Sequence, residues 1–248
     1  MTDIHCHILP AIDDGAASLE VSLAMARLSA ASGVDTIIAT PHFGCDDVNA
    51  KSRADMIREK GELLRSALRE NNIPITLYTG AEIGGASALD PARLRRGELP
   101  TLNGTRYMLC EFHFDDPSIP VMDRVLHSML AEGIVPILAH PERYEAVVHD
   151  PRVVLRWRND GCGIQVNKAS VNGLFGKQVQ NAVLWFLDHR LVTAVATDSH
   201  ETGERRAPQM DRLRDTLEAR LGRDYTRLLL CDNPQNIIHD RPLQDARK

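Results

Sequence analysis

The sequence has no long hydrophobic run. Its longest apolar stretches, such as residues 134–139, fall far short of the ~20 apolar residues that a transmembrane helix needs. The chain also begins directly with a polar motif, where a signal peptide would carry a charged and then an apolar region. We therefore expect a cytoplasmic protein that does not insert directly into a membrane.

An excess of positive charge is also missing. The formal net charge is −5 at pH 7, from 29 Lys and Arg against 34 Asp and Glu. Nucleic-acid-binding domains and membrane-binding arms carry a basic patch that attracts phosphates. Neither nucleic acid nor a membrane surface is therefore an expected partner.

Cysteine is scarce and scattered. The five cysteines form no CxxC pair, and their odd number and wide spacing argue against a disulfide framework or a structural zinc site. We interpret them as core thiols: Cys6, Cys45, Cys110, Cys162 and Cys231.

No linker, low-complexity tract or internal repeat marks a second domain. The 248 residues, 43% hydrophobic and 25% charged, suit one α/β domain that spans residues 1–248. Short β-type runs alternate with stretches of helical period, which is typical of a parallel sheet or barrel. The seven β-type runs are residues 3–7, 36–42, 75–83, 107–114, 135–140, 163–168 and 192–200. The predicted helices are residues 18–32, 51–70, 121–132, 153–160, 179–189 and 209–221.

Histidines and carboxylates follow the ends of these runs. In the first run Asp3, His5 and His7 alternate with apolar residues, so they share one strand face. Asp13 and Asp14 follow it, just before a glycine turn. The carboxyl ends of parallel strands meet at one edge, where function collects. The remaining candidates at such ends are His42, Glu82, Glu111, His140, Asp198 and His200.

Each motif has an ordinary structural interpretation when it is taken alone: a short HxH by chance, a turn, a surface histidine or a salt-bridged carboxylate. However, burying an unpaired carboxylate is costly, and metal coordination removes that cost at both Glu82 and Glu111. Five histidines and four carboxylates at corresponding strand ends therefore favour a metal site.

The blocks at residues 3–10, 13–15, 39–42, 80–83, 111–112, 139–143, 165–167 and 198–200 resemble, in the same order, those of a known family. This family is the polymerase and histidinol phosphatase (PHP) metallohydrolases, specifically their bacterial capsule and exopolysaccharide tyrosine-protein phosphatase branch. The resemblance implies a distorted (β/α)7 TIM-like barrel with three divalent metal ions. Manganese is the usual metal, and iron and zinc are the alternatives.

The resemblance also implies how the ligands are shared. His5, His7 and Asp198 would hold one ion, Glu111 and His140 a second with Glu82 bridging, and Asp14, His42 and His200 a third. Arg143 and Arg205 would face the phosphate, with Arg206 as an alternative to Arg205. His113 follows Glu111 on the same strand face, where the family pattern has no histidine. It would contact the substrate or lie exposed at the rim.

The implied reaction is hydrolysis of phosphotyrosine by a metal-activated hydroxide, without a covalent enzyme intermediate. The residues agree in one respect, because no cysteine is followed six residues later by the arginine that a cysteine-dependent phosphatase requires. Residues 172–177 lack the spacing and hydroxyl of a phosphate-binding Walker loop, and we interpret them as a turn.

By the same resemblance, the substrate would be the phosphotyrosine-containing tail of a membrane tyrosine kinase that controls capsule or exopolysaccharide synthesis. Histidinol-phosphate phosphatase is the alternative enzyme, since the same metal cluster would hydrolyse a small alkyl phosphate. A metal-bound assembly factor with little catalysis is the alternative of a different class.

Overall fold

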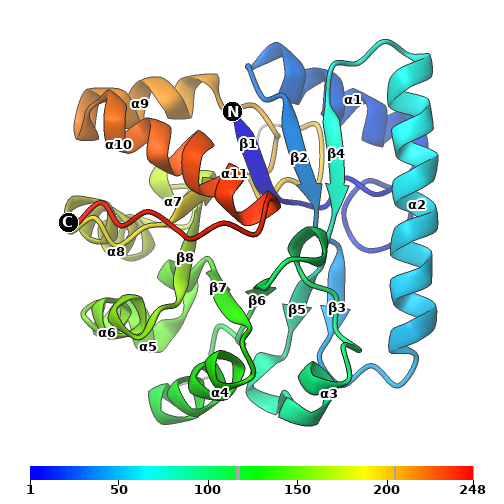
Figure 1. Cartoon of the computed structure of the whole chain (residues 1–248). Helices are drawn as coiled ribbons and strands as arrows, with labels where there is room; N and C mark the ends of the chain where they lie inside the picture. Colours follow the sequence, from blue (N-terminus) through cyan, green and yellow to red (C-terminus); the bar gives the residue numbers. More distant parts are fainter. Residues whose placement is uncertain (116–117, 204, 248) are drawn as a thin grey trace.

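The computed structural model describes residues 1–115, 118–203 and 205–247, whose strands all pair in parallel (Figure 1). One sheet has the order β1 (Thr2–Cys6), β2 (Thr36–Ala39) and β4 (Thr76–Thr79). The other contains, in order, β3 (His42–Gly44), β5 (Glu82–Gly84), β6 (Tyr107–Cys110), β7 (Val135–Ala139), β8 (Gly163–Asn167) and β9 (Ala194–Ala196).

The two sheets form one distorted barrel because two of the predicted runs are each divided into two strands. The run at residues 36–42 becomes β2 and β3, divided at Pro41, which has no N–H for the ladder. The run at residues 75–83 becomes β4 and β5, divided at Gly80, where a Cβ would lie only 3.1 Å from Leu102 Cα. Seven strand positions therefore circle the barrel in the described residues, as predicted.

The barrel closes between β1 and the segment after β9. The backbone N–H of His7 donates to Ser199 O at 2.9 Å, and that of Asp198 donates to His5 O at 2.8 Å. Cys6 and Ser199 form an isolated parallel bridge. These bonds place the predicted ligands of the first and last strands side by side.

The six predicted helices are present with ends shifted by at most a few residues. They are α1 (Leu19–Ala31), α2 (Ala50–Glu70), α4 (Ile119–Ala131), α6 (Val153–Asp160), α8 (Lys177–Asp188) and α9 (Asp211–Leu221). Ser18 caps α1 by accepting from Val21 N–H. Asn72 and Gly133 have positive φ angles of 53° and 77° just after α2 and α4, which explains why these helices stop there.

The prediction missed several elements. Three of them contain too few residues to show a helical period: α3 (Pro91–Arg95), α5 (Glu145–His149) and α7 (Lys168–Val171). Three others follow one another directly, and the π-helical turn in the middle interrupts the 3.6-residue period: α10 (Arg223–Arg227), η4 (Leu228–Asp232) and α11 (Asn233–Ile238). The predicted strands at 107–114 and 192–200 were too long. β6 ends at Cys110 and β9 at Ala196, since the polar residues that follow turn into the mouth of the barrel.

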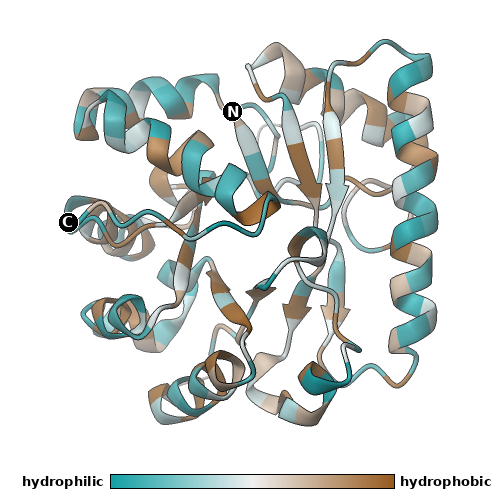
Figure 2. Ribbon diagram, in the orientation of Figure 1, coloured by the Kyte–Doolittle hydropathy of each residue, from teal (hydrophilic) through white to brown (hydrophobic). Residues whose placement is uncertain are grey.

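Hydrophobic side chains fill the barrel and the layer beneath the helices. In Figure 2 brown segments recur along the strands, most clearly on β2, whereas the surrounding helices carry much teal. Cys6, Cys45, Cys110 and Cys162 are buried and Cys231 is half-buried, all as free thiols, which confirms their interpretation as core residues. The C-terminal helix α11 packs against β1, so the two ends of the chain stabilise the same part of the barrel.

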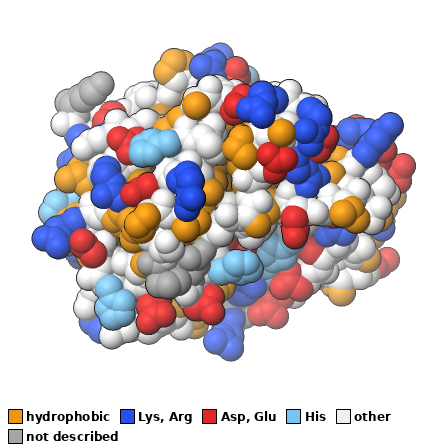
Figure 3. Space-filling view, turned by 90° about the horizontal axis from the view of Figure 1, so that it is seen from below, with side chains coloured by type: hydrophobic (Ala, Val, Ile, Leu, Met, Phe, Trp, Pro, Cys, Tyr) orange, Lys and Arg blue, Asp and Glu red, His pale blue; other side chains and the backbone are white. Residues whose placement is uncertain are grey.

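In the part of the chain that the structure describes, no helix is both long enough and apolar enough to cross a membrane. On the face seen in Figure 3, acidic, basic and hydrophobic side chains are intermixed. This agrees with the nearly balanced charge count of the sequence.

Candidate metal centre

The structure brings all nine predicted ligands together at the carboxyl-terminal mouth of the barrel. His5 is the penultimate residue of β1 and His7 follows β1 directly. His42 and Glu82 are the first residues of β3 and β5. Glu111 follows β6, His140 follows β7, Asp198 and His200 follow β9, and Asp14 lies in the loop before α1. The division of the predicted runs at residues 36–42 and 75–83 into two strands each therefore places His42 and Glu82 at the barrel mouth.

The deep part of this cluster is almost fully buried. Glu82 Oε1 lies 3.3 Å from His5 Nε2 and 3.1 Å from His140 Nε2. Asp198 Oδ1 lies 3.5 Å from both His5 Nε2 and His7 Nε2, and these two nitrogens are 3.2 Å apart. Imidazole nitrogens and carboxylate oxygens that converge at such distances are the donor atoms that a divalent cation needs.

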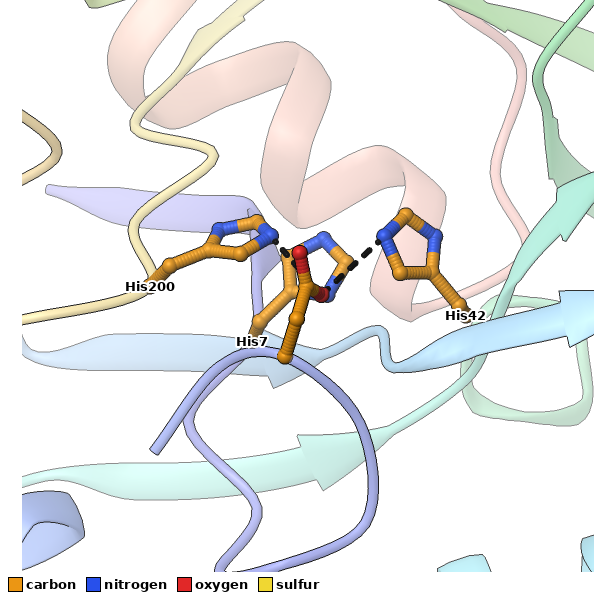
Figure 4. A group of neighbouring side chains, drawn as sticks. His7, His42 and His200 are labelled. Atoms are coloured by element: carbon orange, nitrogen blue, oxygen red, sulfur yellow. Dashed lines mark ion pairs between the residues drawn. The ribbon is translucent and has the colours of Figure 1, made fainter. Parts of the chain in front are cut away.

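The rim part is open to solvent at Asp14 and His42, whereas His7 and His200 are buried. Figure 4 shows His7, His42 and His200 around one carboxylate, that of Asp14, with dashed lines for its ion pairs. Asp14 Oδ1 lies 3.3 Å from His42 Nε2 and 3.4 Å from His200 Nε2. The Asp14 and His42 side chains are 64% and 41% exposed, so a ligand could approach from this side.

Among the described residues there are four sets of possible metal ligands, and within each set the ligand atoms lie within 4.8 Å of one another. Several residues belong to more than one set. The sets are His7, Asp14, His42 and His200; His5, His140 and Asp198; His5, His7 and Glu82; and His42, Glu82 and Glu111. The first set contains the whole predicted third group. His140, however, lies with His5 and Asp198 as well as near Glu111, at 3.5 Å. The nine residues thus form one continuous cluster, and their division among ions stays a prediction.

The donor set suits divalent cations. It consists of imidazole nitrogens and carboxylate oxygens, and no described cysteine belongs to any of the four sets. His200 Nε2 is buried and has no hydrogen-bond partner among the described residues, yet it lies in the group with Asp14 and His42. Leaving a buried polar atom without a partner costs about 1–3 kcal/mol, which a bound cation would remove.

Two amides on β8 hold the deep ligands in place. His5 Nδ1 lies 2.8 Å from Gln165 Oε1, which can only accept, so Nδ1 carries the proton and Nε2 keeps its lone pair for the cluster. Gln165 Nε2 then donates to Asn167 Oδ1 at 2.8 Å, and Asn167 Nδ2 donates to Asp198 Oδ2 at 2.7 Å. Sequence reasoning assigned these residues no role, although two polar side chains two positions apart in a buried strand were the available signal.

Asp13 orients His7 in the same way. Its Oδ2 accepts from His7 Nδ1 at 2.8 Å and from the backbone N–H of His42 at 3.0 Å. Burial would raise the pKa of Asp13, but the hydrogen bond and charge of His7 lower it to about 2. Gly15 is required here, since a Cβ would lie 2.1 Å from His7 O. Of the two adjacent aspartates, Asp14 therefore faces the cluster, whereas Asp13 orients His7.

The electrostatics of the cluster favour a cation. Burial alone would lower the pKa of His5, yet Glu82 and Asp198 raise it to about 9. Burial would also lower the pKa of His7, but its hydrogen bond to Asp13 raises that pKa to about 10. Burial and neighbouring Glu82 raise the pKa of Glu111. The carboxylates thus create a negative potential that favours a bound cation.

Asp3 shares the strand face of His5 but belongs to none of the four sets. It accepts from the backbone N–H of Thr197 at 3.1 Å and also from the Thr197 hydroxyl. Asp3 therefore joins β1 to the segment that carries Asp198, and supports the site without facing it.

The backbone is strained at two of the ligands. His140 and Asp198 have positive φ angles of 36° and 50°, a conformation that non-glycine residues rarely adopt. His140 starts the short 3-10 helix η3 (Pro141–Arg143). This turn brings Arg143 back over the cluster, with its NH1 3.7 Å from Asp198 Oδ2.

Arg143, Arg205 and His113 were predicted to contact the substrate, and the structure places them differently from one another. Only Arg143 lies over the cluster. Arg206, and not Arg205, pairs with the cluster, since its NH2 donates to Asp198 Oδ1 at 2.7 Å. Arg205 is exposed and lines a neighbouring cavity of about 570 Å³ with Lys168 and Arg212. His113 is exposed at the rim, beside Gly85, and belongs to none of the four sets.

The fold and the site define a parallel α/β barrel protein with a histidine–carboxylate cluster at its mouth, the class of the metal-dependent hydrolases. Residues 1–239 match the family described as capsular polysaccharide synthesis, CpsB/CapC. The chain belongs to this family, and the predicted resemblance is confirmed.

Two relatives match nearly end to end. Tyrosine-protein phosphatase YwqE of Bacillus subtilis is 32% identical over 98% of this chain and 93% of its own. Tyrosine-protein phosphatase CpsB of Streptococcus pneumoniae is 33% identical over 97% of this chain and 99% of its own.

Solved structures agree with the barrel. A crystal structure from a study of YwqE and CpsB, described there as unique metal-dependent tyrosine phosphatases, superimposes with a TM-score of 0.89 at 30% identity, covering 100% of this chain and 98% of that one. A dihydropyrimidinase from Brevibacillus agri superimposes with a TM-score of 0.59 at 10% identity, covering 99% and 72%, and shows likeness of fold alone. The expected distorted barrel is confirmed.

Proposed function

We propose that this protein is a metal-dependent phosphatase that hydrolyses phosphotyrosine. The observation that carries the proposal is the cluster of nine imidazole and carboxylate ligands that converges at the barrel mouth. The family match and the names of both relatives, tyrosine-protein phosphatases, support the same reaction.

We propose three divalent ions, of which manganese fits the mixed nitrogen and oxygen donors, with iron or zinc as alternatives. The nine residues that would hold them are His5, His7, Asp14, His42, Glu82, Glu111, His140, Asp198 and His200. When bound, such ions supply a hydroxide at neutral pH and stabilise charge on the phosphoryl oxygens. Four carboxylates against three divalent ions leave a net charge of roughly +2, which complements a phosphate monoester dianion.

The chain's own residues then bind and orient the phosphate. Arg143 stands over the cluster without coordinating it, because a guanidinium has no free lone pair to offer. Its planar fork can donate two parallel hydrogen bonds to phosphate oxygens. Arg206 is already bound to Asp198, so we assign it to holding that ligand and leave Arg205 to contacts farther along the substrate.

A thiol nucleophile does not fit this structure. Burial raises the pKa of the thiols of Cys6, Cys45 and Cys110, and it raises the pKa of Cys162 to about 12. Thiolate is the reactive form of cysteine, and these environments disfavour it. These environments argue against a cysteine nucleophile, and we propose hydrolysis by a metal-activated hydroxide without a covalent enzyme intermediate.

We further propose that the substrate is the phosphotyrosine-containing tail of a membrane tyrosine kinase and that the protein meets it in the cytoplasm. The family description, capsular polysaccharide synthesis, supports a role in that process. A tyrosine leaving group has a pKa of about 10 and needs less protonation than a serine alkoxide, which favours aryl phosphates at such a site.

Turnover of a phosphotyrosine peptide, p-nitrophenyl phosphate and histidinol phosphate, each measured with added manganese, tests the proposal. We expect kcat/KM to be highest for the two aryl phosphates. A preference for histidinol phosphate would instead identify a small-molecule phosphatase. Full metal occupancy with no turnover of any of the three would identify an assembly factor.

A further inference from the structure

Two phenylalanine rings contact the guanidinium of Arg143. Its Cζ lies 4.2 Å from the centroid of the Phe114 ring and 4.4 Å from that of Phe175. The three residues come from separate parts of the chain: the loop after β6, the turn η3, and the turn between α7 and α8. The last of these is the segment at residues 172–177, which sequence analysis interprets as a turn without a phosphate-binding role.

The Arg143 guanidinium makes no hydrogen bond with any residue in the described ranges 1–115, 118–203 and 205–247. Its nearest charged partner, Asp198 Oδ2, is 3.7 Å from NH1, which is beyond hydrogen-bonding distance. That carboxylate already accepts from Arg206 at 2.7 Å and from Asn167 at 2.7 Å. A side chain that is only 21% exposed therefore keeps its donors unused beside the cluster.

We propose that Phe114 and Phe175 are positioning residues that hold Arg143 ready for phosphate. Each ring has the Arg143 Cζ over its face, at 4.2 Å for Phe114 and 4.4 Å for Phe175, whereas the N–H donors of a guanidinium lie in its plane and point outward from Cζ. The donors thus stay free for an anion. Without the rings, the guanidinium can turn toward Asp198 and form the close pair that it now avoids, which would compete for a metal ligand. The inference rests on the proposed role of Arg143 in phosphate binding.

Both rings stand on anchored loops. The carbonyl of Phe114 accepts from the backbone N–H of Glu145 at 2.8 Å, and the Phe114 ring lies 5.7 Å from the His140 ring. On the other side, Leu174 N–H donates to Ala169 O at 2.9 Å and fixes the turn that carries Phe175. Phe114 is 40% exposed, so its ring is accessible at the rim of the cluster.

Steady-state kinetics on a phosphotyrosine peptide, with metal content measured in the same samples, tests this inference. We expect Phe175→Leu and Phe114→Leu each to lower kcat/KM by roughly 3- to 30-fold, the range of a cation–π contact. Phe175→Tyr should restore the activity because it keeps an aromatic face. Leu155→Ala removes a similarly exposed apolar side chain, 42% exposed, from α6, which carries no residue of the cluster, and this control should stay within about twofold of wild type.

The decisive comparison repeats the leucine substitutions in an Arg143→Ala background. If the rings act through Arg143, they should then lower kcat/KM no further, since effects that share one partner are not additive. An equal loss in both backgrounds, or failure of Phe175→Tyr to restore activity, would overturn the positioning role. If Arg143→Ala is slow but the leucine variants are not, only this inference fails. If Arg143→Ala is itself active, the phosphate-binding role fails with it.

Discussion

The deep and rim parts of the metal cluster differ in how their ligands are held. In the deep part, His5, Glu82, His140 and Asp198 are at most 3% exposed, and Gln165 and Asn167 tie two of them together. At the rim, the Asp14 and His42 side chains are 64% and 41% exposed, and both side chains form ion pairs with other predicted ligands.

This difference has a physical meaning. Ligands oriented by further hydrogen bonds within a buried strand need little reorganisation to bind an ion, so they bind tightly. Exposed ligands must be ordered by the ion itself, and water competes for the same positions. The deep part therefore provides a rigid base, and the rim provides the open side through which a phosphate can enter. The predictions below test this contrast.

Metal removal should have the largest effect. We expect a chelator to abolish phosphatase activity, and readdition of manganese to restore it, because the proposed chemistry depends on the bound ions. Stepwise chelation should release the rim ion before the others. A thiol alkylating agent is the control, and full inhibition by it in protein that retains its metals would contradict a metal-based mechanism.

Substitution of deep ligands should come next. His5→Ala and Asp198→Ala should each lower the metal content even in excess manganese, since either change leaves a neighbouring buried charge without its partner. His42→Ala at the rim should lose metal that excess manganese restores. Elemental analysis at two manganese concentrations measures the difference. Equal metal loss in the deep and rim variants would show that the two parts of the cluster bind metal equally tightly. Unchanged stoichiometry in His5→Ala and Asp198→Ala would exclude them as ligands.

Arg143→Ala should leave the metal complement and the fold intact. It should lower kcat/KM by an amount that corresponds to a loss of roughly 2 to 4 kcal/mol of transition-state stabilisation. Arg143→Lys should recover only part of this loss, because an ammonium restores the charge without the bidentate fork. A wild-type kcat/KM in Arg143→Ala would show that the side chain serves only as a rim ion pair.

The smallest effect should come from the support of the deep ligands. Gln165→Leu removes the acceptor for His5 Nδ1 without touching a predicted ligand. We expect metal affinity to fall by about 10- to 100-fold, the usual result of losing such a hydrogen bond. Titration of metal-free protein with manganese measures it. An unchanged affinity would mean that burial alone orients His5.

The convergence of the predicted ligands was largely predictable because these residues follow strand ends. His5 and His7 alternate along one strand, and His140 and Asp198 end apolar runs, so their common location follows from the geometry of parallel strands. The six longer helices were predictable for a related reason, since period and stop residues are local features of the sequence.

Other features depend on which distant residues meet. Asp13 and Asp14 are chemically identical neighbours, and only their contacts show that one faces the cluster while the other holds His7. Arg205 and Arg206 differ in the same way, because the path of a loop decides which guanidinium reaches Asp198.

The sequence by itself determined the chemical character of this protein, because its histidines and carboxylates recur at the ends of β-type runs and their spacing is set by local chain geometry. Only the tertiary structure decided which side chains support those ligands. Phe114 and Phe175 show why: no local pattern joins them to Arg143, and their contact exists only because three separate loops converge at one edge of the closed barrel.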